Sequence, residues 1–219
     1  MKKALLMAAL AAAVVGGALG CGGGRSGVKP APLSVSTFTD TRDGQVYKIV
    51  KIGRQVWFAE NLNYGAEGSS CYENNADSCA KYGRLYDWNT AMKTCPAGTH
   101  LPTDKEWTTL VKYVGGDSTA AMNLKSRTGW NSYKGKSGNG TDIYGFSALA
   151  GGYGYGGDDF DATGSYGYWW SATEHHANEA WFREMNSSGE SVWRLINSKT
   201  PTLLYSVRCV ADNRKEAQK

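Results

Sequence analysis

The chain opens with an uninterrupted apolar stretch, and apolar residues later recur at the spacings of strands and helices. Residues 1–20 begin with two lysines and continue as an uncharged run rich in alanine, leucine and valine. Its apolar core, roughly residues 4–15, is shorter than the about 20 residues that a helix needs to cross a bilayer. Small residues follow it directly. The pattern is typical of a secretory signal peptide that is removed on export.

The next patterned segment predicts a β-hairpin followed by a short helix. Two β-branched and aromatic runs, residues 45–52 and 55–62, flank Gly53 and Arg54, which fits a tight turn between antiparallel strands. Residues 87–94 favour a short helix with Asp87 as its cap.

Residues 103–114 predict a second, longer helix. Thr103 and Glu106 stand in the spacing of a capping box, and apolar residues at 107, 110, 111 and 114 share one helical face. Gly115 and Gly116 are expected to end the helix. We therefore interpret the acidic residues of this segment as helix-start chemistry rather than as general acids or metal ligands.

From residue 129 onward the composition changes to long stretches rich in glycine and tyrosine. Short aromatic or β-branched runs interrupt these stretches and predict strands at 146–150, 168–173, 179–186, 191–196 and 203–210. The chain is therefore predicted to have an α+β fold, with two main helices, antiparallel strands and long Gly/Tyr-rich loops presented by a rigid base.

The composition of the remaining residues indicates one folded domain with a polar segment on each side. Residues 21–36 are rich in glycine, serine and proline and predict a flexible tether, while residues 213–219 read as a polar tail. Residues 37–212 have the size and the apolar content of a single folded domain.

Charge argues against nucleic acid as a partner. Removing residues 1–20 takes away two of the 24 basic residues and none of the 20 acidic ones, which leaves 22 against 20. No cluster of lysine and arginine appears that could follow a phosphate backbone.

The segment Ala-Leu-Gly-Cys that ends at Cys21 resembles the lipobox of bacterial lipoproteins, although Ala18 stands where leucine is most usual. The resemblance implies that Cys21 is acylated and becomes the mature N-terminus, so that the lipid anchors the protein to a membrane. Two glycines follow Cys21 in place of the acidic residue that retains such proteins at the inner membrane, which favours the outer membrane. The alternative is simple secretion with an unmodified Cys21.

The other four cysteines are expected to form two disulfides, because an even number in an oxidising compartment is typical of disulfides. Four cysteines allow three connectivities. Cys71 and Cys79 bracket a short polar loop that could close locally, in which case Cys95 would pair with Cys209. A zinc site is the alternative, but the spacings are not the paired short ones of zinc fingers.

Six blocks of sequence, in this order, resemble the Fibrobacter succinogenes major paralogous domain (FISUMP). They lie at residues 56–64, 82–91, 95–107, 146–153, 168–173 and 205–210. The resemblance implies an exported bacterial protein, often a lipoprotein, of largely undefined function. Two of the segments, residues 101–107 and 207–210, are more distantly similar to the formylglycine-generating enzyme type of C-type lectin-like fold. That similarity implies a C-type lectin-like domain and supports the Cys95–Cys209 pairing.

Enzymatic activity is not expected. Enzymes of the formylglycine-generating type use cysteines near the end of the chain, where this chain has only Cys209, which is predicted to be in a disulfide. The EPN, QPD and WND signatures of calcium-dependent lectins do not occur. His175 and His176 lie close to two glutamates, but the metalloprotease motif HEXXH is absent, and we interpret this segment as a structural turn. His100 is expected to fix the loop before the capped helix.

Aromatic residues in the glycine-rich region are the candidate binding site. Flat amphipathic rings stack on sugars or protein side chains and still use their polar atoms. The candidates are Tyr153, Tyr155 and Tyr166, with Trp169 or Trp170. The alternative is that the tyrosines only pack the loop down, and Trp170 in particular favours the core.

Asp158, Asp159 and Asp161 form a candidate Ca²⁺ site, because carboxylate oxygens are ligands that Ca²⁺ accepts. A solvated acidic loop is the alternative, and no other cofactor is expected. The sequence as a whole predicts a non-catalytic, lipid-anchored binding module for an extracellular polysaccharide or surface protein. The alternatives are an enzyme of the formylglycine-generating type, another enzyme, or a structural component of the envelope.

Overall fold

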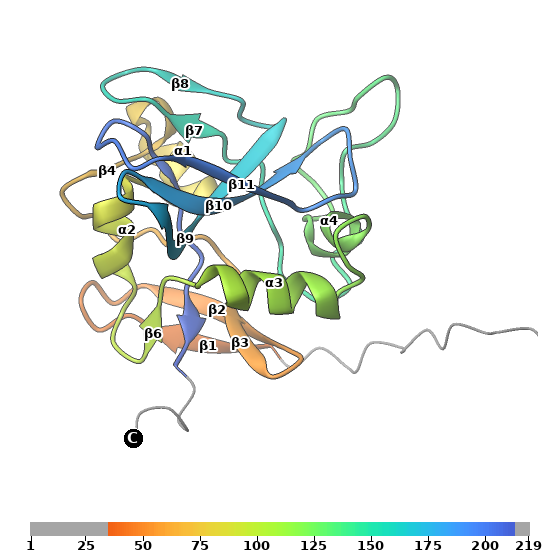
Figure 1. Ribbon diagram of the computed structural model, residues 1–219, viewed down its shortest axis with the longest axis horizontal. Coiled ribbons are helices and arrows are strands. Elements are labelled where there is room, and N and C mark those ends of the chain that lie inside the picture. Colours follow the sequence, from red (N-terminus) through yellow and green to blue (C-terminus); the bar gives the residue numbers. More distant parts are fainter. Residues whose placement is uncertain (1–34, 213–219) are drawn as a thin grey trace, which may run out of the picture.

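The computed structural model describes residues 35–212 as a mixed α+β domain that consists mostly of sheet, with a few short helices (Figure 1). The predicted signal peptide, Cys21 and the polar tail lie outside the described residues. The strands are β1 (Val35–Thr39), β2 (Val46–Ile52), β3 (Gln55–Phe58), β4 (Ser69–Ser70), β5 (Leu85–Tyr86), β6 (Thr99–His100), β7 (Tyr153–Gly154), β8 (Phe160–Asp161), β9 (Tyr166–His176), β10 (Glu179–Asn186), β11 (Trp193–Ser198), β12 (Tyr205–Ser206) and β13 (Val210–Ala211). The helices are η1 (Tyr72–Asn74), α1 (Ala76–Tyr82), α2 (Trp88–Thr94), α3 (Asp104–Tyr113) and α4 (Ala120–Leu124).

Two larger sheets and one small hairpin make up the described part of the chain. The five-stranded sheet has the order β1-β2-β3-β13-β6, the six-stranded sheet has the order β11-β10-β9-β12-β5-β4, and β7 pairs with β8. Helix α3 lies between β1–β3 and the long strands β9–β11, and the β7–β8 hairpin lies on the other side of those strands (Figure 1). The six-stranded sheet therefore has one face covered by α3 and another face toward β7 and β8.

The predicted hairpin is confirmed as β2 and β3, which pair antiparallel across Gly53. Gly53 has a φ of 62°, a conformation that side chains disfavour, so glycine suits this turn. Strand β1 adds to β2 with Val35 opposite Val50. Val35 and Ser36, the last two residues of the segment predicted as a tether, thus belong to β1.

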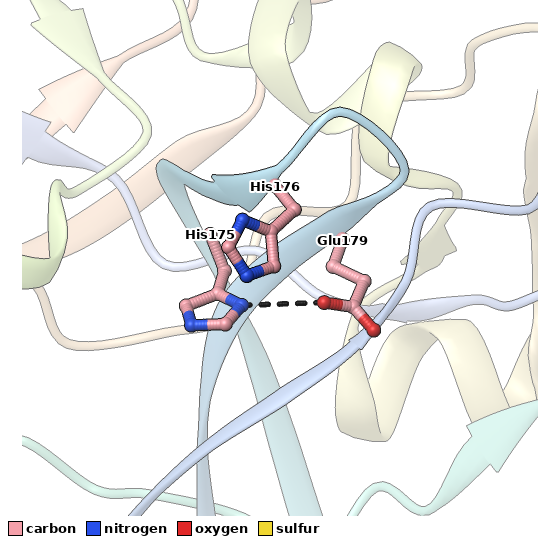
Figure 2. Close-up of side chains that lie close together, drawn as sticks. All are labelled: His175, His176 and Glu179. Carbon is pink, nitrogen blue, oxygen red and sulfur yellow. Dashed lines mark hydrogen bonds and ion pairs between the residues drawn. The ribbon is translucent and has the colours of Figure 1, made fainter.

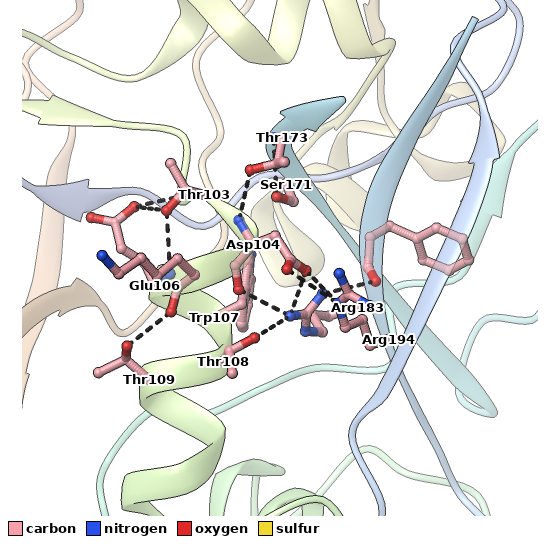
Figure 3. A network of polar contacts seen from close by, with 12 residues as sticks. Thr103, Asp104, Glu106, Trp107, Thr108, Thr109, Ser171, Thr173, Arg183 and Arg194 are labelled. Carbon is pink, nitrogen blue, oxygen red and sulfur yellow. Dashed lines mark hydrogen bonds and ion pairs between the residues drawn. The ribbon is translucent and has the colours of Figure 1, made fainter. Parts of the chain in front are cut away.

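The two predicted helices are confirmed. Asp87 caps α2 by accepting a hydrogen bond from the Thr90 amide at 3.1 Å. Thr103 and Glu106 form the complete capping box of α3 (Figure 3). Gly116 ends α3, with its amide donating to the Val111 carbonyl at 2.9 Å.

Several other elements differ from the sequence predictions. Helix α1 occupies part of the segment predicted as a polar loop, since Asn75 caps it through the Asp77 amide. Residues 146–150 do not form a strand, because Ser147 has a φ of 52° that breaks the extended run. The run 203–210 divides into β12 and β13, which belong to different sheets.

Tryptophan rings form the centre of the core between α3 and the two sheets. Trp57 of β3, Trp107 of α3 and Trp169 of β9 are each fully buried. The ring centroids of Trp57 and Trp107 are 4.9 Å apart, and those of Trp107 and Trp169 are 6.5 Å apart. These contacts fix α3 against both sheets at once.

A buried polar node connects segments that are distant in sequence. Arg208 is fully buried, and its guanidinium donates to the Asn61 side-chain oxygen at 3.1 and 2.9 Å and to the carbonyls of Phe58 and Phe146. The same Asn61 oxygen accepts from the Trp169 indole at 2.9 Å. Burial lowers the pKa of Arg208 to about 9, so these acceptors are what keeps a charge tolerable at this position.

Both expected disulfides are present. Cys71 pairs with Cys79 across a separation of 8 residues, and Cys95 pairs with Cys209 across a separation of 114 residues. The second bridge joins the end of α2 to the segment that precedes β13. This is the connectivity that local closure of the Cys71–Cys79 loop implied.

Replacing Asn61 with alanine is expected to destabilise the domain strongly. The buried guanidinium of Arg208 would lose two hydrogen bonds and the Trp169 indole one, which should cost about 3 kcal/mol or more of the free energy of unfolding. Urea unfolding of Asn61→Ala measures this loss. Asn63→Ala is the matched control, because the half-buried Asn63 side chain makes no hydrogen bond within residues 35–212, and a loss below about 0.5 kcal/mol is expected there. Equal losses in the two variants would contradict this role for Asn61.

The two disulfides are expected to contribute unequally to stability. In the loop-entropy description, closing the longer loop stabilises by about 5 kcal/mol and closing the shorter one by about 2.6 kcal/mol. The double variant Cys95→Ala/Cys209→Ala should therefore unfold about 2 kcal/mol more easily than Cys71→Ala/Cys79→Ala in a denaturant titration. The reverse order would show that native-state contacts of the short bridge, rather than loop length, dominate.

Candidate functional site

The face of the six-stranded sheet that lies away from α3 carries a partly exposed aromatic surface. Side chains alternate between the two faces of a strand, so Tyr166 and Tyr168 of β9 share a face. Glu184 of β10 is opposite Tyr168, and Trp193 of β11 is opposite Glu184. We call Tyr166, Tyr168, Glu184, Trp193 and Leu195 the aromatic face.

The aromatic face is accessible at its edge and anchored at its centre. Trp193 is 51% exposed, and Tyr166 and Leu195 are each 36% exposed. The Tyr166 and Tyr168 rings are nearly parallel, with centroids 5.8 Å apart, and Tyr168 is stacked on the buried Tyr205 at 5.0 Å. The outermost ring is therefore held by rings that extend into the core.

Polar atoms lie among these rings. The Glu184 carboxylate accepts a hydrogen bond from the Asn186 amide at 3.3 Å, and burial raises the pKa of Glu184. Burial, with the nearby Glu184 charge, also raises the pKa of the Tyr168 hydroxyl. Tyr168 therefore keeps its proton at neutral pH. The face offers a hydroxyl donor and a carboxylate acceptor beside flat apolar rings.

The structure brings together two of the predicted binding residues. Tyr166 belongs to the aromatic face, and the half-buried Tyr153 of β7 meets Tyr168 edge-on at 5.5 Å. Tyr155 is 56% exposed, but within residues 35–212 its ring pairs with no other aromatic ring. Its amide instead donates to the Asp159 carbonyl within the β7–β8 turn.

The prediction that Trp169 binds a ligand is wrong. Trp169 points to the opposite face of β9, where it is fully buried and donates to Asn61. Trp170 is in the core, as expected, and its indole donates to the Tyr86 carbonyl at 2.8 Å.

The predicted calcium site is not supported by the geometry. Asp158, Asp159 and Asp161 are exposed, and Asp158 accepts a hydrogen bond from Asn74 at 2.6 Å. In the part of the chain from 35 to 212 the three carboxylates do not converge on a common point, whereas the ligand atoms of His175, His176 and Glu179 do. The exposed positions of the three aspartates fit the alternative, a solvated acidic loop.

A charged network fixes the other face of the same strands to α3 (Figure 3). Asp104 forms ion pairs with the buried Arg183 at 2.8 Å and with Arg194 at 2.9 Å, and Arg183 also donates to Thr108 at 3.1 Å. Burial by itself would raise the pKa of Asp104, but hydrogen bonds from Arg194 and Arg183 outweigh it and lower this pKa. Asp104 is thus a structural anion that holds β10 and β11, the strands that carry the aromatic face.

The three histidines of the chain lie in two different places. His100 lies between Glu106 at 2.8 Å and Asp212 at 2.6 Å, so it fixes the segment before α3 as expected. His175 and His176 end strand β9 and are not in the turn itself, which corrects the structural-turn interpretation (Figure 2).

Tyr168, Glu184, Trp193 and Leu195 were not among the predicted site residues. The alternating pattern of residues 179–186 and 191–196 predicted both strands. The register that places Trp193 opposite Glu184 depends on how β10 and β11 pair, which the pattern of each strand alone does not specify. Two runs of aromatic residues in neighbouring predicted strands are the signal that could have indicated such a surface.

These features define a disulfide-linked α+β domain with an exposed aromatic face on a rigid sheet. The sequence model of the Fibrobacter succinogenes major domain matches residues 50–211, so the chain belongs to this family. A search of curated proteins found no match, and a search of solved structures found none either. Within residues 35–212, no helix is long and apolar enough to span a bilayer.

Titration of His100 is expected to reduce stability at alkaline pH. Hydrogen bonds that the imidazolium donates to the carboxylates of Glu106 and Asp212 raise its pKa from 6.5 to about 9. Because the folded pKa lies above the unfolded one, the stabilisation is fully present below pH 6.5 and is lost as the pH rises toward 9. His100→Gln should remove this loss.

Urea unfolding of the parent chain and His100→Gln at pH 6, 7.5 and 9 measures the effect. The buried Lys125, whose pKa is lowered to about 8, contributes the opposite slope in both proteins, so the difference between the two profiles isolates His100. Parallel profiles would contradict the assignment.

Proposed function

We propose that this domain is a non-catalytic binding module that recognises an extracellular polysaccharide through the aromatic face. The observation that carries the proposal is the row of rings from Tyr205 through Tyr168 to Tyr166, with the exposed Trp193 on the same face. A surface protein is the second candidate ligand, since aromatic rings beside polar groups also suit protein contacts.

The chemistry of the face suits a sugar polymer. Sugar rings present apolar C–H faces that stack on flat aromatic rings, while their hydroxyl groups need donors and acceptors close by. Tyr168 and Glu184 supply a donor and an acceptor between the rings. The exposed edge of the face, at Tyr166, Trp193 and Leu195, is where a polymer would contact it, and the network around Asp104 holds the strands in place from behind.

Further support for a non-catalytic role comes from groups that are already engaged. Cys209, the cysteine where an enzyme of the formylglycine-generating type would need a thiol, is bonded to Cys95. Asp104 is paired with two arginines, and Glu106 is bonded to His100. We also propose a C-type lectin-like fold, supported by the disulfide that joins the α2 end to the last strands and by the pairing of β13 with β3.

The proposed location is the outer membrane, with a lipid on Cys21 as the anchor. The signal-like residues 1–20 and the lipobox-like segment before Cys21 support this proposal. Membership of the Fibrobacter succinogenes major domain family is consistent with a surface protein. A structural role in the envelope without a small ligand is the alternative.

Binding of the full chain to a panel of plant and bacterial polysaccharides tests the function. Trp193→Ala and Tyr166→Ala are each expected to weaken binding about tenfold, through lost stacking worth about 1.4 kcal/mol, without changing thermal stability. Tyr113→Ala is the matched control, because Tyr113 is 54% exposed at the end of α3 and lies outside the aromatic face. Binding should also survive a chelator.

Equal weakening by Tyr113→Ala would place the binding surface elsewhere. Absence of binding to every glycan would favour a protein partner or the structural role.

A further inference from the structure

The end of the β9–β10 hairpin brings two adjacent histidines to one side of the strand. Neighbouring residues in a regular strand point to opposite faces. Here Glu179 pairs with His176 while Ala180 pairs with Glu174, so His175 is one extra residue on β9, a β-bulge. A bulge re-aims side chains, and bulges are frequent next to functional sites.

The bulge places three metal-binding groups together (Figure 2). The His175 and His176 ring centroids are 4.0 Å apart, and His175 Nδ1 lies 3.2 Å from Glu179 Oε2. One ligand atom from each of His175, His176 and Glu179 lies within 4.8 Å of the other two. Ligands at about 2.1 Å from a tetrahedral zinc ion are about 3.4 Å apart, so the His175–Glu179 pair already has the required separation.

We propose that His175, His176 and Glu179 form a binding site for a divalent transition-metal ion, with Zn²⁺ as the ion to test. Imidazole nitrogens with one carboxylate suit Zn²⁺ and its neighbours in the transition series, whereas Ca²⁺ and Mg²⁺ favour oxygen ligands alone. Three protein ligands leave a fourth position of a tetrahedral ion open. His176 is exposed, so that position faces solvent and is available to water or to a donor from another molecule.

The surroundings hold the site in place and keep it electrostatically suitable. Trp181 of β10 packs edge-on against His175 at 4.9 Å, which limits rotation of this ring. Lys199 is engaged by Glu174 in an ion pair, and Arg194, which stacks on Trp181, is paired with Asp104, so both charges are compensated. The site is separate from the aromatic face, because Trp181 alternates with Phe182 and Glu184 and points to the other side of β10.

Isothermal titration of the full chain with Zn²⁺ tests the proposal. A Cys21→Ser background removes the one cysteine outside the two disulfides, so that no free thiol competes. We expect one bound ion per chain, and an affinity that falls at least about tenfold in His176→Ala and in Glu179→Gln, since each removes one of three ligands.

His100→Gln is the matched control, because His100 is the one histidine of the chain outside the proposed site and also contacts two carboxylates. It should bind Zn²⁺ like the parent. Thermal unfolding confirms that each variant is folded, and Zn²⁺ should shift the NMR signals of the His175 and His176 rings but not those of His100. Unchanged affinity in His176→Ala, loss of binding in His100→Gln, or no binding by the parent would each overturn the proposal.

Discussion

The hydrogen-bonded node of Arg208 and Asn61 is the interaction on which the rest of the fold depends. A fully buried guanidinium without a carboxylate partner is costly unless acceptors surround it, and here they come from Phe58, Asn61, Phe146 and Ser147. These residues lie in sequence blocks that resembled the family. The blocks therefore largely encode the scaffold, which explains why they say little about the ligand.

Hydrogen bonds and ion pairs connect this node to the strands that carry the aromatic face. Asn61 also bonds Trp169, which fixes one face of β9, and Asp104 fixes β10 and β11 through Arg183 and Arg194. Because these contacts hold the face toward α3, the side chains of the aromatic face at the sheet edge are not needed to hold the strands together. Trp193 and Tyr166 are exposed there, and Tyr166 is connected to the core through the half-buried Tyr168, which stacks on the buried Tyr205.

Irregularities of the sheet contribute the remaining chemistry. The bulge at His175 is a local change of pairing, yet it turns an ordinary strand end into a group of two imidazoles and a carboxylate. The same strand has a second irregularity between Trp170 and Glu174, where the Ala172 amide leaves the β10 pairing and donates to the Pro102 carbonyl. Strand β9 thus contacts the segment that precedes α3 and also carries the two histidines at the end of the hairpin.

The sequence by itself determined the β2–β3 hairpin, the capped helices α2 and α3, and strand β10, because turn residues, capping groups and periodicity act within about a dozen residues. It also singled out Tyr166, which the structure places on the aromatic face, and led to both disulfides. Only the tertiary structure decided that Trp169 is core, that Trp193 stands opposite Glu184, and that the three aspartates do not converge. The physical reason is register: a shift of one residue moves every side chain of a strand to the other face, and register is set by contacts between distant segments.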